Sequence, residues 1–188
     1  MGREYMKDIE IETERLLLRK FKMEDTEHCF TNFGKDDSLG KYFPMYPVED
    51  QMAMKEMIQG YVYAYENNAY IWLIQVKGTE ELIGNISVSI PYKELEIGEI
   101  AYLIGSKWWN KGYAYESVRA VIWHMLQKEN LYMIEAKYNE TNIASGNLLR
   151  KLGFKEDGRL RGRRIDRDGG KRNSLVVCSI LRNEFTHS

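Results

Sequence analysis

The sequence has few of the features that mark membrane, secreted or metal-dependent proteins. Only Cys29 and Cys178 are cysteines among its 188 residues, and no cysteine pair has the spacing of metal ligands. Secreted chains usually use cysteine for disulfides, so two thiols in a reduced interior are the better interpretation. The longest apolar run, LVVCSIL at 175–181, is too short to span a bilayer, and the first twenty residues are too charged for a secretory signal. We therefore expect a soluble, cytoplasmic protein without a membrane partner.

The chain also lacks an excess of charge of either sign. Its 27 basic and 28 acidic residues give a formal net charge of −1, whereas a dedicated nucleic-acid-binding domain needs a basic face. We therefore expect no nucleic-acid partner. His28 and His124 have no ligand spacing, so no metal is expected either.

No repeat, low-complexity tract or Pro/Gly/Ser-rich linker divides the chain, so we expect a single domain over residues 1–188. Helical periodicity and capping residues predict helices at 23–34, 49–67, 115–130 and 142–152. Apolar runs and turn residues predict strands at 14–21, 70–76, 81–90, 96–105 and 132–138, and two more around the DRDGGK turn at 166–171. Hairpins combined with a strand–helix–strand unit predict an α/β (α+β) fold with a mixed sheet of about seven strands.

Between the strand at 96–105 and the helix at 115–130 lies WWNKGYAYES, an aromatic stretch with two small residues, Gly112 and Ala114. The amino terminus of a helix presents unpaired N–H groups and a partial positive charge, which favours bound anions. Small side chains let a phosphate reach successive amides, and Lys111 can add charge. The P-loop and GxGxxG patterns are absent. The spacing alone leaves two interpretations, a pyrophosphate cradle or an ordinary turn.

Two motifs in this order carry a family resemblance. WNKGYA at 109–114 fits [Q/R/W]-x-x-G-x-[G/A], and NIASGNLLRKLGF at 142–154 fits N-x-x-S-x-x-x-x-x-K-x-G-F. With TERLLLRKF near the start and LVVCSILRNEF near the end, nearly the whole chain resembles the GNAT superfamily of acyl-CoA-dependent N-acetyltransferases. The likeness is closest to the branch that acetylates the amino termini of ribosomal proteins.

The resemblance implies a strongly twisted mixed sheet with helices on both faces. In such a sheet the strand carrying Glu99 parts from the strand around Glu135, and the gap admits the pantetheine arm of acetyl-CoA. A backbone N–H near Leu103 or Ile104 would polarise the thioester carbonyl. The residues implied to hold the cofactor in the turn are Trp109, Asn110, Lys111, Gly112, Tyr113, Ala114 and Tyr115.

A primary amine is mostly protonated at neutral pH, so it must lose a proton before it attacks a thioester. The resemblance implies that Glu99 is the base, acting directly or through a water, with Glu94 and Glu96 as alternatives. The other interpretation of Glu99 is an exposed carboxylate or the partner of a nearby arginine.

The departing thiolate of coenzyme A needs a proton, and the resemblance implies that Ser145 supplies it. Other branches of the superfamily use a tyrosine, and no tyrosine is an equally good candidate in this sequence. Ser145 could instead be a plain polar residue in the first turn of its helix. Asn142 is a good N-cap and also resembles the asparagine that contacts the cofactor arm, and Asn147 is a further candidate for such a contact.

The acceptor side is less clear from the sequence. The YFPMYP loop has no periodicity, and the family covers its acceptor there, so Tyr42, Phe43 and Tyr46 are expected to line that site. Tyr61 and Tyr65 fit the apolar stripe of the helix at 49–67 instead. Trp108 and Trp109 are expected to pack, with Trp109 shaping the turn.

Two charge features bear on the partners. Residues 155–172 hold eight basic and four acidic residues, a local excess of +4. Such a run is usually a solvated hairpin, but it also suits an acidic partner or the 3′-phosphate of coenzyme A. The branch often has an aspartate where this chain has Ser174, which weakens the inference that a ribosomal protein is the acceptor.

The sequence therefore predicts an acetyl-CoA-dependent N-acetyltransferase, working by direct attack on a primary amine in a ternary complex, as a monomer or a homodimer. The acceptor would be a protein or peptide amino terminus or a small amine. The alternatives are a polyamine or amine-antibiotic acetyltransferase and, outside the enzymes, a catalytically silent acyl-CoA-binding module. The sequence does not exclude longer acyl groups.

Overall fold

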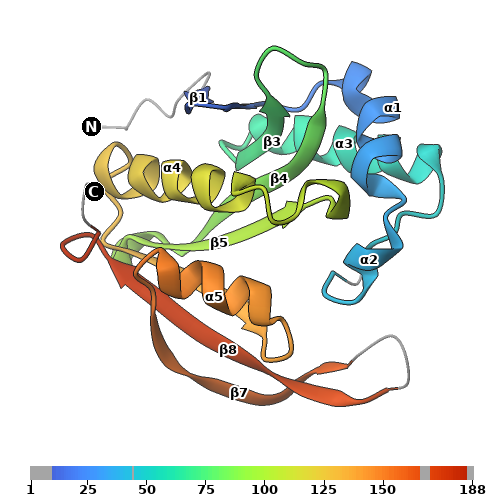
Figure 1. The fold of residues 1–188 in the computed structure, drawn as a ribbon. Helices are drawn as coiled ribbons and strands as arrows, with labels where there is room; N and C mark the ends of the chain where they lie inside the picture. The colour runs from blue at the N-terminus through green and yellow to red at the C-terminus, as the bar shows by residue number, and fades with distance from the viewer. Residues whose placement is uncertain (1–9, 44, 166–169, 186–188) are drawn as a thin grey trace.

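The fold is built on one sheet of eight strands, seen in a computed structural model that describes residues 10–43, 45–165 and 170–185 (Figure 1). The strand order is β1-β2-β3-β4-β5-β6-β8-β7. The strands are β1 (Ile11–Glu12), β2 (Leu16–Arg19), β3 (Tyr70–Val76), β4 (Leu82–Tyr92), β5 (Ile97–Ile104), β6 (Met133–Asn139), β7 (Lys155–Ile165) and β8 (Arg172–Leu181). All neighbours are antiparallel except β5 and β6, which are parallel. The predicted mixed sheet is confirmed, and the short β1 adds one strand to the expected seven.

Helices cover the sheet from both sides. On one face lie the 3₁₀ turn η1 (Met23–Asp25), α1 (Thr26–Cys29), the π-helical turn η2 (Phe30–Gly34), α2 (Asp37–Gly40) and α3 (Gln51–Tyr65). On the other face lie α4 (Tyr113–Gln127) and α5 (Ile143–Lys151). Two further 3₁₀ turns, η3 (Lys93–Leu95) and η4 (Ser106–Trp108), flank β5. None of these helices is long and apolar enough to cross a membrane.

Two separate apolar cores explain why both faces are covered. One core packs Val121 and Leu149 from α4 and α5 against strand residues such as Ile100. The other packs Phe33 and Ile58 from η2 and α3 against Leu103 and its neighbours. Successive side chains of a strand point to opposite faces, so β5 contributes alternate residues to each core. The two faces of β5 therefore meet different surroundings.

The boundaries of α4 and α5 follow from their caps. Gly112 has φ +82° and is the N-cap of α4, so this helix begins at Tyr113, two residues before the predicted start at 115. Asn142 caps α5 through its side chain, which accepts a hydrogen bond of 3.1 Å from the Ser145 N–H. Gly153, just after α5, has φ +96°, the left-handed conformation that glycine often adopts at the end of a helix.

Candidate active site

The parallel strands β5 and β6 pair over only part of their length. Their register runs from Ile97 opposite Met133 to Ile100 opposite Ala136, although β5 continues to Ile104 and β6 to Asn139. Beyond Ile100 the facing edges of the two strands have no ladder with each other. Backbone groups along this gap are available to an amide-rich ligand. The strands thus part where the family resemblance implied that they would.

One backbone amide at the end of β5 faces this gap. A Cβ on Gly84 would lie 2.0 Å from the Leu103 carbonyl oxygen, so that carbonyl is directed at β4. In a strand the N–H and C=O of one residue point the same way, and the next residue points the other way. Ile104 therefore faces the gap, where its carbonyl accepts a 2.7 Å hydrogen bond from Trp109 Nε1. Of the two amides expected near the thioester, the geometry favours that of Ile104.

A cavity of 430 Å³, called here the helix cavity, opens between the first turns of α4 and α5 and the end of β5. Its walls include the expected residues Leu103, Ile104, Trp109, Asn110, Gly112, Tyr113, Ala114, Tyr115, Asn142 and Ser145. Lys111 and Asn147 do not line it. Both side chains are exposed, and Asn147 accepts a hydrogen bond from Arg150. The cation in its wall is Lys151, with Nζ 4.5 Å from the centre of the Tyr115 ring.

An ion pair holds the turn at the start of α4. Arg15 donates from Nε to Glu116 Oε2 at 2.7 Å and from Nη1 to the Lys111 carbonyl at 2.9 Å. Thr13 Oγ1 adds a 2.6 Å hydrogen bond to Glu116 Oε1. Partial burial alone would raise the pKa of Glu116, but the hydrogen bonds from Thr13 and Arg15 outweigh it and lower the pKa. This clamp of Thr13, Arg15 and Glu116 fixes the loop that brings the Gly112 backbone to the cavity, and no sequence pattern predicted it.

Two hydroxyl groups meet at the floor of the helix cavity. The Tyr102 hydroxyl lies 2.6 Å from Ser145 Oγ, within a hydrogen bond that either oxygen can donate. Burial raises the pKa of Tyr102 to about 12, with the Ser145 hydrogen bond opposing this shift. Tyr102 is therefore a neutral donor at physiological pH. The expectation that no tyrosine competes with Ser145 was wrong, because a tyrosine from β5 is its hydrogen-bond partner.

A second cavity of 250 Å³, called here the strand cavity, lies along β5, β6 and β8 and contains Glu99. Lys137 Nζ donates to Glu99 Oε2 and to Glu135 Oε1, each at 2.8 Å. These hydrogen bonds, first the one to Glu135 and then the one to Glu99, raise the pKa of Lys137. Glu99 thus lines a cavity and is also the partner of a basic side chain, which is a lysine rather than the arginine considered from the sequence.

The two cavities adjoin at the gap, and residues from both faces of the sheet line each of them. Tyr102 and Ser145 lie on the α4–α5 face, whereas Glu99 belongs with Leu103 on the other face because strand residues alternate. Five residues line both cavities: Tyr42, Phe43, Tyr102, Asn142 and Ser145. Two ligands, one in each cavity, would therefore meet beside the paired hydroxyls.

Some expected residues lie elsewhere. Tyr46 lines neither cavity, because its ring is 2% exposed and packs with Phe33 and Phe43 in the second core. Glu94 is exposed on η3, and Glu96 contacts Arg182 at 3.5 Å.

Both cysteines, and the two histidines that the structure describes, His28 and His124, lie outside both cavities. Cys29 and Cys178 are buried, and burial raises the pKa of both thiols. His28 is exposed, whereas His124 is buried beside Glu129 at 3.5 Å. Within the described residues no cluster of three or more His, Cys, Asp or Glu could hold a metal ion.

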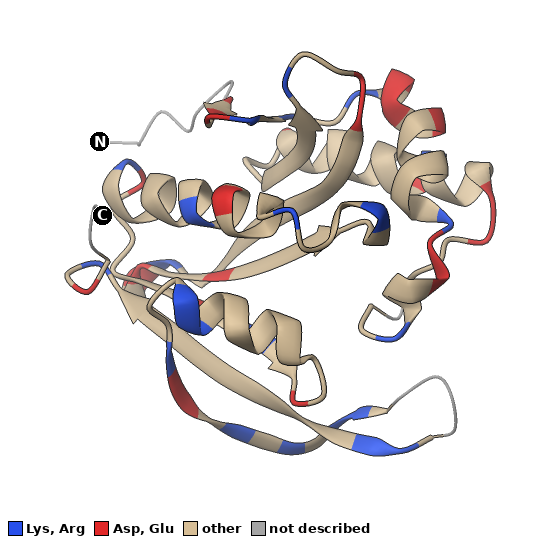
Figure 2. Cartoon of the chain, viewed as in Figure 1, with Lys and Arg blue, Asp and Glu red and all other residues tan. Residues whose placement is uncertain are grey.

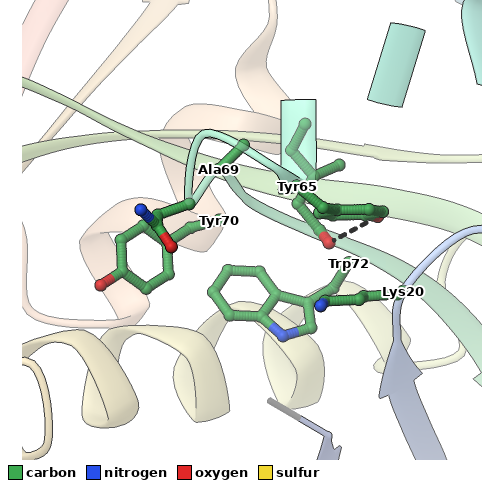
Figure 3. A pocket seen from close by; sticks show the side chains of 7 residues that line it. Lys20, Tyr65, Ala69, Tyr70 and Trp72 are labelled. Carbon is green, nitrogen blue, oxygen red and sulfur yellow. Dashed lines mark hydrogen bonds between the residues drawn. The ribbon is translucent and has the colours of Figure 1, made fainter. Parts of the chain in front are cut away.

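A third hollow lies at the start of β3, where Lys20, Tyr65, Ala69, Tyr70 and Trp72 surround it (Figure 3). Its volume is 20 Å³, close to that of a single water molecule. The Tyr65 hydroxyl beside it donates a hydrogen bond of 3.0 Å to the Ile71 carbonyl and so stabilises the fold. This hollow is too small for a substrate.

Comparisons with known proteins agree with this geometry. Residues 15–155 match the family model of the acetyltransferase (GNAT) domain. The "Uncharacterized N-acetyltransferase p20" of Bacillus licheniformis is 33% identical over 174 residues, which cover 92% of this chain and 96% of the relative. The structure of the ribosomal-protein-S5-alanine acetyltransferase from Vibrio fischeri superposes with a TM-score of 0.82 at 22% identity, covering 96% of this chain and 100% of that one. RimL, a ribosomal L7/L12 α-N-protein acetyltransferase solved in complex with coenzyme A, gives a TM-score of 0.82 at 17% identity, covering 92% and 98%. At these identities the two structures show a shared fold.

Proposed function

The chain belongs to the GNAT acetyltransferase family, and from that premise we propose that it transfers an acetyl group to a primary amine by direct attack within a ternary complex. Acetyl-CoA supplies the acetyl group as an activated thioester. The observation that carries the proposal is the meeting of the helix cavity and the strand cavity at Tyr102 and Ser145. Neither cysteine lines a cavity, so an acyl-cysteine relay has no support.

The helix cavity fits the diphosphate and the pantetheine arm of acetyl-CoA. The first amides of α4 carry partial positive charge, Gly112 leaves its backbone unobstructed, and Lys151 adds a cation. Asn142 and the free edge of β5 offer hydrogen bonds to the amides of the arm. The Ile104 N–H would stabilise the oxyanion as the thioester carbonyl is attacked.

The paired hydroxyls would protonate the leaving thiolate. Ser145 Oγ would donate its proton to the thiolate and regain one from Tyr102, to which it is hydrogen-bonded at 2.6 Å, and Tyr102 would then regain a proton from solvent. Tyr102 suits this role because its raised pKa, about 12, keeps it protonated at neutral pH.

Glu99 would take the proton that the ammonium group of the acceptor must lose before the free amine can attack. It lines the strand cavity, where Lys137 Nζ holds its Oε2 at 2.8 Å. Glu99 can remove the proton directly or through a bridging water, the two routes expected from the family resemblance. Lys137 would keep Glu99 oriented between turnovers and would not itself be a base, because its pKa is raised.

We also propose that residues 1–188 form one acetyltransferase domain that works in the cytoplasm. All strands of the described residues belong to one sheet, which supports a single domain. Two unpaired cysteines support a reducing compartment.

An acetyl-transfer screen over peptide amino termini, polyamines and aminoglycosides, read by release of free thiol, tests the proposed function. We expect thiol release that depends on both acetyl-CoA and one class of amine. Tight binding of acetyl-CoA without turnover of any amine would instead support a silent acyl-CoA-binding module. Turnover confined to polyamines or aminoglycosides would identify the small-amine alternative.

A further inference from the structure

The strand cavity has charges of opposite sign at its two ends. Glu99, beside the gap, is the carboxylate end. Arg164 of β7 reaches the other end of the same cavity, where one of its Nη atoms donates to the Tyr42 carbonyl. Lys137 is already paired with two carboxylates, so Arg164 is the cation in this wall without a carboxylate partner among the described residues.

An unpaired amide lies next to Arg164. Asn173 of β8 is paired with Arg164 across the two strands, so their side chains share one face of the sheet. Leu175, two residues along β8, lines the strand cavity from that same face. Asn173 is 3% exposed, and its Nδ2 has no hydrogen-bond partner among the described residues. A buried amide donor of this kind is costly unless a ligand satisfies it.

The two ends are separated along the sheet. Glu99 lies opposite Glu135, which lies opposite Ser179 of β8, whereas Arg164 lies opposite Asn173. Six residues of β8 correspond to about 20 Å between these backbone positions, and the long arginine side chain shortens the span. An extended peptide covers about 3.3 Å per residue, so an amine at Glu99 and an acid at Arg164 would be a few residues apart.

The strand that carries Arg164 is a basic edge. β7 is the outermost strand, and Lys and Arg recur along it (Figure 2). Arg159 is paired with Glu156, whereas Arg161 and Arg163 are exposed and have no carboxylate partner among the described residues. An edge strand with unpaired backbone groups and a run of cations is complementary to an extended acidic chain.

We propose that the acceptor is a peptide amino terminus with acidic residues among positions two to five, whose carboxylates bind Arg164 and are attracted by the β7 edge. This proposal rests on the proposed function and adds the class of substrate. The expected amine lies at Glu99, and the first acid makes a charge-assisted hydrogen bond to Arg164. A polyamine, which has no anion, would leave Arg164 without a carboxylate partner.

A set of three peptides with the same first residue tests the proposal, with Asp and Glu, Asn and Gln, or Lys at positions two to five. For the full-length chain we expect kcat/KM for the acidic peptide to exceed that for the amide peptide about tenfold. The lysine peptide should be poorer than either. Added salt should reduce the preference, because part of the attraction is between exposed charges.

Variants separate Arg164 from general charge effects. Arg164→Gln should remove most of the acid preference while the KM for acetyl-CoA stays unchanged. Arg164→Lys keeps the charge and should retain much of the preference, even though it alters the contact with Tyr42. Lys55→Gln makes the same charge change at an exposed position of α3 and should keep the full preference.

The failures are distinguishable. Turnover of peptides with no preference for acids, or equal turnover by Arg164→Gln and wild type across the series, overturns this proposal and leaves the acetyltransferase function intact. Turnover of free aspartate or glutamate as good as that of the acidic peptide shows that a small amino acid, and not a peptide, is the acceptor. Turnover of no amine at all overturns the proposed function and this inference together.

Discussion

The helix cavity and the strand cavity are built by different means. The helix cavity is made largely of backbone groups, small residues and aromatic side chains at the start of α4, with a single lysine in its wall. The strand cavity also has many apolar and aromatic residues in its wall, but it differs by three charged side chains from different strands, Glu99, Lys137 and Arg164. Backbone geometry suits the part of a ligand that all donors share, whereas charged side chains suit a variable acceptor. In the proposed function, backbone groups therefore recognise the constant donor, and charged side chains select the acceptor.

Removal of the carboxylate in the strand cavity should have the largest effect on rate. Glu99→Gln is expected to lower kcat/KM about 10²-fold at pH 6, because the variant lacks the carboxylate that would remove the proton from the amine. The deficit should shrink as the pH approaches the pKa of the acceptor amine, which then loses its proton to solvent. A pH–rate profile, with acetyl-CoA affinity as the control, measures this. The same profile for mutant and wild type would contradict the role of Glu99.

Removal of either hydroxyl at the junction of the cavities should have a somewhat smaller effect. Tyr102→Phe and Ser145→Ala are each expected to lower kcat about 30-fold, because a thiolate is a better leaving group than most and needs less help. Since the two hydroxyls act as a unit, the double variant should be little worse than the poorer single variant. Fully additive losses would show that the two hydroxyls act independently.

A change in the backbone cradle should weaken donor binding without altering the chemistry. Gly112→Ala places a Cβ at φ +82° and 3.1 Å from Arg15, so we expect the Kd for acetyl-CoA to rise about tenfold. Gly60→Ala is the matched control, because nothing lies within 4 Å of its Cβ in the exposed face of α3. That control should bind acetyl-CoA normally and gain about 0.5–1 kcal/mol in stability. Calorimetric titration and thermal unfolding measure both quantities, and equal affinity of the two variants would refute the cradle.

The clamp at the start of α4 should give the smallest effect, on stability. The folded pKa of Glu116 is lowered, so its contribution is present above the unfolded pKa of about 4.3 and is lost as the pH falls through the folded value. Glu116→Gln should cost about 1 kcal/mol at pH 7. The wild type should lose this advantage between pH 5 and pH 3, as followed by denaturant unfolding. A constant difference across that range would exclude the linkage.

The sequence predicted the parts that depend on local pattern. Strand alternation, helix periodicity and the caps at Asn142 and Gly153 are local properties, and they located most of the sheet, α3, α4 and α5. The small size of Gly112 and Ala114 is visible in the sequence and made a backbone cradle one of two interpretations of their turn, and the family resemblance favoured it. The helix cavity was therefore largely predictable.

The contacts between distant elements were not predictable. Tyr102 is 43 residues from Ser145, and only the arrangement of β5 and α5 brings their hydroxyls together. Lys137 reaches Glu99 because of the parallel register of β5 and β6. Asn147 does not line the helix cavity, because a residue two positions after Ser145 points about 200° around the helix axis from it. Tyr46 lies in a loop without periodicity, so nothing in the sequence distinguished a core ring from a lining one.

The claim that donor and acceptor meet where the two cavities adjoin is tested most directly by initial-rate kinetics in which both substrates are varied. Direct attack in a ternary complex requires both cavities to be filled before any bond breaks. The account predicts intersecting double-reciprocal lines and no release of coenzyme A until the amine is added. Parallel lines, with a burst of free thiol from acetyl-CoA alone, would show an acetyl-enzyme intermediate and contradict it.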